Sequence, residues 1–157
     1  MIFPGDIHII LDISGRLKLS PSAVASYDQC GGREVVLHYW PEGSLGILPK
    51  QVWEKLCSVK GYDQADSLVD MQSRLAMLRF MRNSKSDEIS AQGRLTIPVN
   101  LRKSAGLECG REVVLTSNGQ YLNVWNPERL AKVMTHLDAV DQQECEEVFP
   151  QLRVKSK

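Results

Sequence analysis

Short apolar runs separated by turn-forming residues dominate the first third of the chain. Such runs, rich in β-branched residues and bounded by glycine, proline or aspartate, predict β-strands. The expected strands are Ile7 to Leu11, which we expect to be buried, Arg16 to Leu19, Glu34 to Tyr39 and Ser44 to Leu48. Pro21 to Tyr27 is expected to form a weak helix of small residues. The pattern predicts a strand-rich unit with one short helix.

Apolar residues three and four positions apart indicate helices in the middle of the chain. A short helix is expected from Lys50 to Leu56, and a longer one from Asp63 to Arg82. Leucines and methionines form a stripe along the longer helix, which we expect to serve core packing or contact between subunits. Asp70 and Arg74 are expected to pair four residues apart on this helix. Asn83 to Ser86 is expected to be a polar linker.

The same order of elements recurs in the remainder of the chain. The expected elements are a strand leading into Ser90, a strand at Leu95 to Ile97, a helix at Val99 to Ala105, strands at Glu112 to Thr116 and Tyr121 to Trp125, and a final helix from Pro127. Asn118-Gly119 is a strong hairpin signal between the last two strands. The final helix corresponds to the region from Lys50 to Arg82, and we expect it to pack there.

Two segments repeat in a single register. Gly15-Arg16 lies 78 positions before Gly93-Arg94, and the hexapeptide GREVVL of residues 32–37 recurs with the same offset at residues 110–115. Two independent matches in one register indicate an internal duplication in which each copy is one supersecondary unit.

A weaker match extends the duplication and sets its limits. SLGIL at residues 44–48 corresponds to YLNVW at residues 121–125 with one residue of slippage. We therefore divide the chain into a first half at 1–82, a second half at 83–149 and a polar, basic tail at 150–157, which we expect to be frayed.

The doubled pattern resembles the MraZ family of bacterial transcription regulators. A D-x-x-G-R turn spans Asp12 to Arg16, and its second copy, with Ser90 in place of the aspartate, continues as GRLTIPVNLRKSAGL from Gly93. The resemblance covers roughly Met1 to Leu137. It implies an α/β (α+β) protein of two homologous β-hairpin-plus-helix halves with pseudo-twofold symmetry, an AbrB-like swapped-hairpin double barrel. It also implies a homo-oligomer that assembles as a ring.

The resemblance carries a function as well as a fold. It implies a sequence-specific, DNA-binding transcriptional regulator of the bacterial cell-division and cell-wall gene cluster. Its partner would be double-stranded DNA with promoter repeats, and its location the cytoplasm, in association with the nucleoid. Two alternatives stay open. One is an AbrB-like antitoxin or transition-type regulator, and the other is a protein-binding scaffold that has lost its DNA contacts.

The candidate DNA-binding residues lie in the two Gly-Arg turns and beside them. A strand-turn-strand ribbon can hold an arginine in the major groove, where its guanidinium donates two hydrogen bonds to guanine. We expect Arg16 and Arg94 to read bases, because the preceding glycines permit a positive φ and a close approach to DNA. The remaining cations are expected to hold phosphates. The full set is Gly15, Arg16, Lys18, Gly93, Arg94, Arg102 and Lys103.

A structural role is the alternative for two of these arginines. Arg16 can simply pair with Asp12, and Arg102 can be a buried structural partner. Because Ser90 offers Arg94 no such charge, we expect Arg16 to be the more sensitive position.

Composition excludes several other functions. The 157 residues carry no net charge and have a pI of about 6.8, which counts against a strongly basic nucleic-acid binder. The sequence has no phosphate loop, dinucleotide fingerprint, nucleophile elbow or zinc-protease motif. We therefore expect no enzyme activity, cofactor, metal or small-molecule substrate. The four cysteines are scattered, and we expect them to be buried structural thiols or idle ones. No apolar run reaches the roughly 18 residues of a membrane helix.

Overall fold

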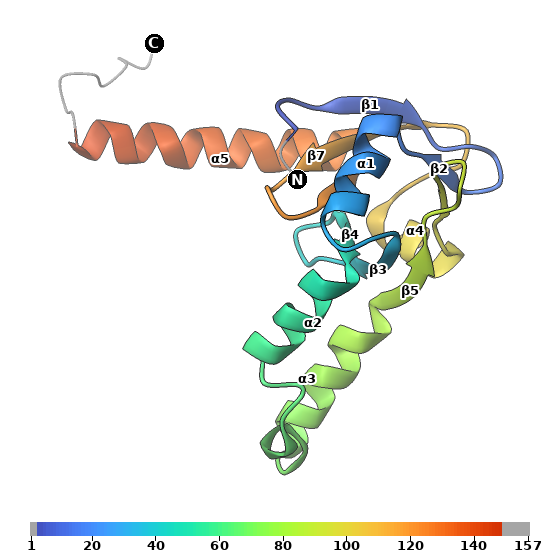
Figure 1. Ribbon diagram of the computed structural model, residues 1–157. Coiled ribbons are helices and arrows are strands. Elements are labelled where there is room, and N and C mark those ends of the chain that lie inside the picture. Colours follow the sequence, from blue (N-terminus) through green and yellow to red (C-terminus); the bar gives the residue numbers. More distant parts are fainter. Residues whose placement is uncertain (1–2, 149–157) are drawn as a thin grey trace. The chain divides into compact units, whose positions relative to one another are not determined.

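The computed structural model describes residues 3–148, so the predicted tail at 150–157 lies outside the described residues. The chain separates into one compact unit that ends at Asn126 and a second that begins at Pro127 (Figure 1). The described part of the second unit is helix α5 (Pro127–Val148). The division between residues 82 and 83 concerns the repeat copies and stays a prediction.

The first unit alternates short strands with helices. Its elements are β1 (Ile7–Ile10), β2 (Arg16–Lys18), α1 (Pro21–Gln29), β3 (Glu34–Tyr39), β4 (Leu45–Pro49), α2 (Lys50–Val59), the 3₁₀ helix η1 (Ala65–Leu68), α3 (Met71–Arg82), β5 (Ser84–Glu88), β6 (Arg94–Thr96), α4 (Val99–Ala105), β7 (Glu112–Ser117) and β8 (Leu122–Trp125). The predicted mixed α/β class is confirmed.

Pseudo-twofold symmetry governs the pairing of the strands. Six strands form an antiparallel sheet in the order β1-β7-β8-β4-β3-β5, and β2 pairs with β6 in a second sheet. The duplication exchanges β1 with β5, β7 with β3 and β8 with β4, so the order reads the same from either edge. The register obeys the same rule, since Ile10 lies opposite Glu112 and its repeat equivalent Glu88 lies opposite Glu34. The first strand of each half therefore pairs with the hairpin of the other half: β1 with β7, and β5 with β3.

The buried core connects the two sheets. Leu17 and Leu95 from the small sheet are 0% and 1% exposed and belong to the same hydrophobic cluster as the inward residues of the large sheet. Tyr27 of α1 adds a polar tie, because its buried hydroxyl donates to the carbonyl of Ile47 at 2.7 Å and accepts from the amide of Leu122 at 3.3 Å. The small sheet is thus fixed on the core by its apolar face.

The predicted helix from Asp63 to Arg82 is wrong in its first part. Asp70 is the N-cap of α3, and its carboxylate accepts hydrogen bonds from the amides of Gln72 and Ser73 at 3.1 and 3.3 Å. Aspartate favours this position because it satisfies amides that a helix leaves unpaired. The expected pair with Arg74 is also wrong, because that guanidinium donates to the carbonyls of Leu68 and Val69.

Two predictions about the sheet edges are wrong. Asn83 to Ser86 is not a linker, because the chain passes at Ser84 directly into β5, which pairs with β3 along its whole length. The polar sequence SKSDE concealed this strand, as edge strands often carry polar and charged residues. The strand from Ile7 is also less buried than expected, since β1 forms the other edge and Ile10 is 61% exposed.

The apolar stripe of α3 is exposed in the single chain. Met71, Leu75 and Leu78 are 63%, 55% and 54% exposed. The prediction that these side chains pack in the core of the chain is therefore wrong. The alternative, that they form a contact between subunits, stays a prediction. Within residues 3–148, no helix combines the length and hydropathy needed to cross a membrane.

Candidate nucleic-acid interface

The strands that follow the two Gly-Arg motifs pair to form one antiparallel ribbon, β2–β6. Arg16 lies opposite Thr96, Leu17 opposite Leu95, and Lys18 opposite Arg94. Successive side chains of a strand point to opposite faces. Because the two leucines are buried, the flanking positions are exposed, and the outer face of the ribbon carries Arg16, Lys18 and Arg94.

Two further hydrogen bonds tie the ribbon to its turns. The amide of Leu19 donates to the carbonyl of Gly93 at 2.8 Å, and the amide of Ile97 donates to the carbonyl of Gly15 at 2.9 Å. The turn before each strand therefore adjoins the end of the other strand. The predicted base-reading arginines lie at opposite ends of a single ribbon.

Turn 1 (residues 12–16) is held by a carboxylate. Oδ1 of Asp12 accepts from the amides of Ser14 and Arg16, both at 2.8 Å. Oδ2 of Asp12 lies 3.4 Å from Nε of Arg16, in an ion pair whose side chains are both 45% exposed. The amide of Arg16 is the largest cause of the lowered pKa of Asp12, and the amide of Ser14 and the Arg16 charge lower it further. The predicted structural pairing of Arg16 is thus present.

Turn 2 (residues 90–94) has the same backbone and a weaker side-chain brace. The amide of Gly93 donates to the carbonyl of Ser90 at 2.9 Å, as the amide of Gly15 does to Asp12 in turn 1. The hydroxyl of Ser90 accepts only from the amide of Arg94, at 3.0 Å, among the described residues. No ion pair joins Arg94 to another residue of the described range 3–148. Arg94 is therefore less constrained than Arg16.

Both turn glycines have a left-handed backbone and a close neighbour. Their φ values are 77° at Gly15 and 78° at Gly93. A Cβ on Gly15 would lie 2.7 Å from Cζ of Arg102, whereas a Cβ on Gly93 would lie 3.1 Å from both the carbonyl oxygen of Leu19 and Cγ2 of Val24. Val24 and Arg102 are 78 positions apart and hence equivalent. The two turns differ in what fills this equivalent position.

Arg102 projects from α4 against turn 1. Its Nη1 donates to Sγ of Cys109, and its buried Nε has no hydrogen-bond partner within the described residues. The structure thus brings Arg102 to Gly15, whereas Lys103, the next residue of α4, is exposed. The phosphate contacts expected of both residues stay predictions.

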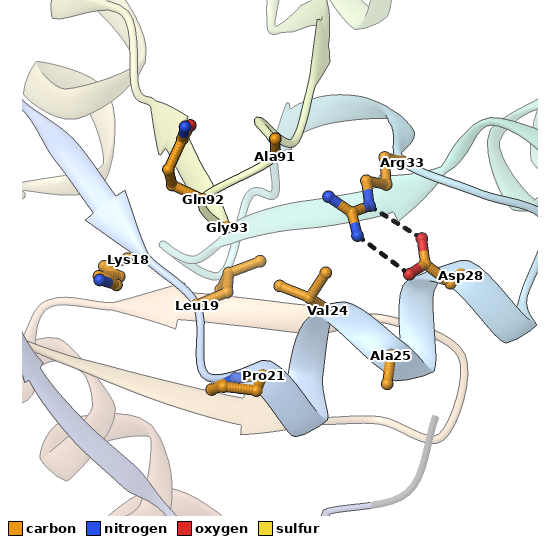
Figure 2. A pocket seen from close by; sticks show the side chains of 10 residues that line it. All are labelled: Lys18, Leu19, Pro21, Val24, Ala25, Asp28, Arg33, Ala91, Gln92 and Gly93. Atoms are coloured by element: carbon orange, nitrogen blue, oxygen red, sulfur yellow. Dashed lines mark hydrogen bonds and ion pairs between the residues drawn. The ribbon is translucent and has the colours of Figure 1, made fainter.

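A hollow lies beside turn 2 and is lined in part by Val24 and Gly93. This cavity has a volume of about 370 Å³. Figure 2 shows its lining, with Gln92 and Gly93 of the turn on one side and Val24 and Ala25 of α1 on the other.

Arg33, at the rim of this hollow, braces turn 2 from outside. Its Nε and Nη2 donate to the two carboxylate oxygens of Asp28 at 3.0 and 3.2 Å, drawn in Figure 2. Its Nη1 donates to the carbonyl of Ser90 at 3.2 Å. The hydrogen bond with Asp28 is the largest cause of a raised pKa of Arg33 and a lowered pKa of Asp28. We did not expect this residue, although the repeated GREVVL motif places an arginine at 33 and 111.

The charges of the ribbon suit an anionic partner. Lys18 and Arg94 lie directly opposite each other, and like charges in this arrangement destabilise a ribbon until a counter-charge binds. A DNA phosphate or guanine edge supplies suitable acceptors.

Residues 3–148 contain no cluster of three or more histidine, cysteine or acidic side chains that could hold a metal ion. Cys30 and Cys57 are partly buried, and Cys109 and Cys145 are exposed; all four are free thiols.

Comparison with known proteins gives consistent matches. The family model described as "MraZ protein, putative antitoxin-like" matches residues 80–147. The chain is 31% identical to "Transcriptional regulator MraZ" of Leuconostoc citreum, over 81% of this chain and 82% of the relative. It is 30% identical to the protein of the same name from Janthinobacterium, over 83% and 87% of the two chains. The corresponding protein of Nitrosomonas europaea is 29% identical, over 96% and 97%.

Proposed function

The chain belongs to the MraZ family, and on this premise we propose that it regulates transcription by binding DNA through the β2–β6 ribbon. Arg16 and Arg94 read base edges in the major groove. Lys18, Arg102 and Lys103 hold phosphates, and Gly15 and Gly93 let the backbone approach the DNA.

One observation supports this function above the others. The ribbon carries two arginines and a lysine on its exposed face while its opposite face is anchored by Leu17 and Leu95 in the core. A guanidinium on such a fixed support loses little conformational freedom when it binds, and a bidentate contact to guanine discriminates between bases. A strand ribbon is also one of the elements that enter DNA grooves.

The zero net charge of the protomer requires several contacts to act together. We propose that protomers assemble into a homo-oligomeric ring, with the exposed stripe of α3 as one contact surface, and that its ribbons engage repeated sites in a promoter. Linked sites gain affinity without new contacts. The proposed target is the promoter of a bacterial cell-division and cell-wall gene cluster, and the proposed location is the cytoplasm, at the nucleoid.

The test is fluorescence anisotropy with labelled DNA from upstream of the chain's own gene and with a shuffled duplex of equal composition. We expect tighter binding to the upstream DNA and a steep salt dependence for both duplexes. Lys103→Ala should weaken both equally and lower the salt slope by about one unit. Equal, weak affinity for both duplexes would contradict sequence-specific regulation.

The description of the matching family model gives the antitoxin alternative some support. An antitoxin of this kind would also bind a toxin, in addition to DNA. Copurification of a stoichiometric small partner protein with the natively expressed chain would favour that function, whereas absence of any DNA binding would favour a protein-binding scaffold.

A further inference from the structure

A second cavity lies within the first unit between β3, the end of α2 and α3. Its volume is about 530 Å³, within the roughly 300–1,000 Å³ that is usual for small-molecule sites. The lining is aromatic and cationic. It includes Trp40, Tyr62 and Phe80, with the charged side chains of Lys60 and Arg79.

The aromatic rings form a connected cluster. The centroid of Phe80 lies 4.4 Å from that of His38, 5.3 Å from that of Tyr62 and 5.1 Å from that of Trp53, with which it stacks. The ring of Trp40 meets His38 edge-on at 4.5 Å. Contacts at these separations hold ring planes in fixed orientations, so the walls of the cavity are preorganised.

The charge inside the cavity is positive. Nζ of Lys60 lies 4.9 Å from the centroid of Phe80 and 5.8 Å from that of Tyr62, where the electron-rich ring faces stabilise a cation. Arg79 supplies a second cation, and the lining drawn from the described residues includes no carboxylate. His38 is 2% exposed, and burial, followed by the charge of Lys60, lowers its pKa to about 4. It is therefore neutral near pH 7, so Lys60 and Arg79 are the charged side chains of the lining.

From this arrangement we propose that the cavity binds a small planar aromatic anion. The ring of the ligand lies against the aromatic wall, and its carboxylate or phosphate accepts hydrogen bonds from Lys60 and Arg79. Arginine suits such an anion because its planar donors match two oxygens at once. The site is separate from the Gly-Arg turns and does not depend on the DNA-binding proposal.

Isothermal titration calorimetry with a matched set of probes tests the charge requirement. The probes are 2-naphthoate, neutral 2-naphthylmethanol and cationic 2-naphthylmethylammonium, which share one ring system and differ in charge. We expect saturable binding of 2-naphthoate and at least tenfold weaker binding of the other two. Equal binding of all three, or no binding of 2-naphthoate, would overturn the proposal.

Variants of the lining test the location. Lys60→Gln and Arg79→Gln should each weaken 2-naphthoate binding by about tenfold, the loss typical of a charge-assisted hydrogen bond. Lys55→Gln on α2 and Arg82→Gln on α3 are the controls, since neither residue lines the cavity. Unchanged binding in both lining variants would contradict the assignment.

Adenosine monophosphate distinguishes the two sources of the anion. If adenosine monophosphate binds more tightly than 2-naphthoate, with the same dependence on Lys60 and Arg79, the natural ligand carries a phosphate. If adenosine monophosphate binds more weakly than 2-naphthoate, the natural ligand carries a carboxylate.

Discussion

The two Gly-Arg turns share one backbone and differ in how it is held. In turn 1, the carboxylate of Asp12 accepts from two amides and pairs with Arg16, while Arg102 packs on Gly15. In turn 2, the hydroxyl of Ser90 accepts from a single amide among residues 3–148. Arg33 supplies the remaining brace by donating to the Ser90 carbonyl.

This difference teaches that a duplicated site can keep its geometry while its supports diverge. Turn 1 is supported by Asp12, which lies within the turn, and by Arg102 of α4. Turn 2 is supported by Arg33, which precedes β3. The exposed Asp12–Arg16 pair is worth little in water, so in the proposed complex DNA can replace Asp12 as the partner of Arg16. What the pair provides is orientation before binding.

The largest expected effect distinguishes the two arginines that we propose to read bases. Arg16→Ala should weaken binding to the chain's upstream DNA by about tenfold or more per engaged subunit, because a bidentate guanine contact carries roughly 1–3 kcal/mol of discrimination. Arg94→Ala should cost less, since Ser90 does not orient this side chain with a charge. Anisotropy titrations at one salt concentration measure both, and a larger loss for Arg94→Ala would reverse the ranking.

The next effect concerns the packing of Arg102 on turn 1. Gly15→Ala should cost about 1–2 kcal/mol of unfolding free energy because alanine is strained at positive φ, and more because the new methyl displaces Arg102. In an Arg102→Ala background this second cost should vanish. Urea denaturation of the wild type, the two single variants and the double variant measures the coupling free energy between positions 15 and 102.

Turn 2 supplies the control for that cycle. In Gly93→Ala the new methyl group meets the backbone carbonyl of Leu19, so Val24→Ala should not restore the stability of that variant.

The prediction for turn 1 has its own contradicting outcome. Additive effects of Gly15→Ala and Arg102→Ala would show that Arg102 does not pack against Gly15 in solution.

A smaller effect is expected from the brace of turn 2. Arg33→Ala should lower the unfolding free energy, since it removes a bidentate pair and a hydrogen bond to the Ser90 carbonyl. Its repeat equivalent, Arg111, is the matched control. That side chain is 76% exposed and pairs only with Glu108 within the described residues, so Arg111→Ala should change stability by less than about 0.5 kcal/mol. An equal loss of stability in Arg33→Ala and Arg111→Ala would contradict a supporting role of Arg33 at turn 2.

The smallest effect is a difference in acid sensitivity. The pKa of Asp12 is lowered in the folded chain, mainly by the amide of Arg16, so its contribution to stability is present above the unfolded pKa and is lost as pH falls through the folded one. Ser90 does not titrate. The protection of the Ser14 and Arg16 amides against exchange, relative to the intrinsic rate at each pH, should therefore fall as pH drops through the lowered pKa of Asp12, while the protection of the Arg94 amide stays constant. A parallel loss of protection at both turns would contradict this difference.

Much of the fold was accessible from the sequence because the repeat is in register. The matching Gly-Arg motifs and GREVVL segments placed both turns and the strands at Glu34 and Glu112 correctly. The polar strand β5 was missed because an edge strand needs no apolar alternation, and the start of α3 was missed because Asp70 caps the helix instead of continuing it.

The positions of the two Gly-Arg turns were predictable from the sequence, but the contacts that support them were not, and their role in reading DNA stays a prediction. Sequence placed Arg16 and Arg94 beside glycines, but the contact of Arg102 with Gly15 joins segments far apart in the chain. The repeat offset alone shows that Val24 in the first half corresponds to Arg102 in the second half. It does not show which turn each one contacts, because that depends on the exchange of strands between the halves.

The most direct test of base reading by the turns is the ratio of affinities for upstream and shuffled DNA in an Arg16→Ala/Arg94→Ala variant. Light scattering first establishes that the variant has the oligomeric state of the wild type. We predict that the ratio falls to about one, while residual binding to both duplexes keeps a salt dependence from the remaining lysines. A wild-type ratio in the intact double variant would show that the turns are structural and that the bases are read elsewhere.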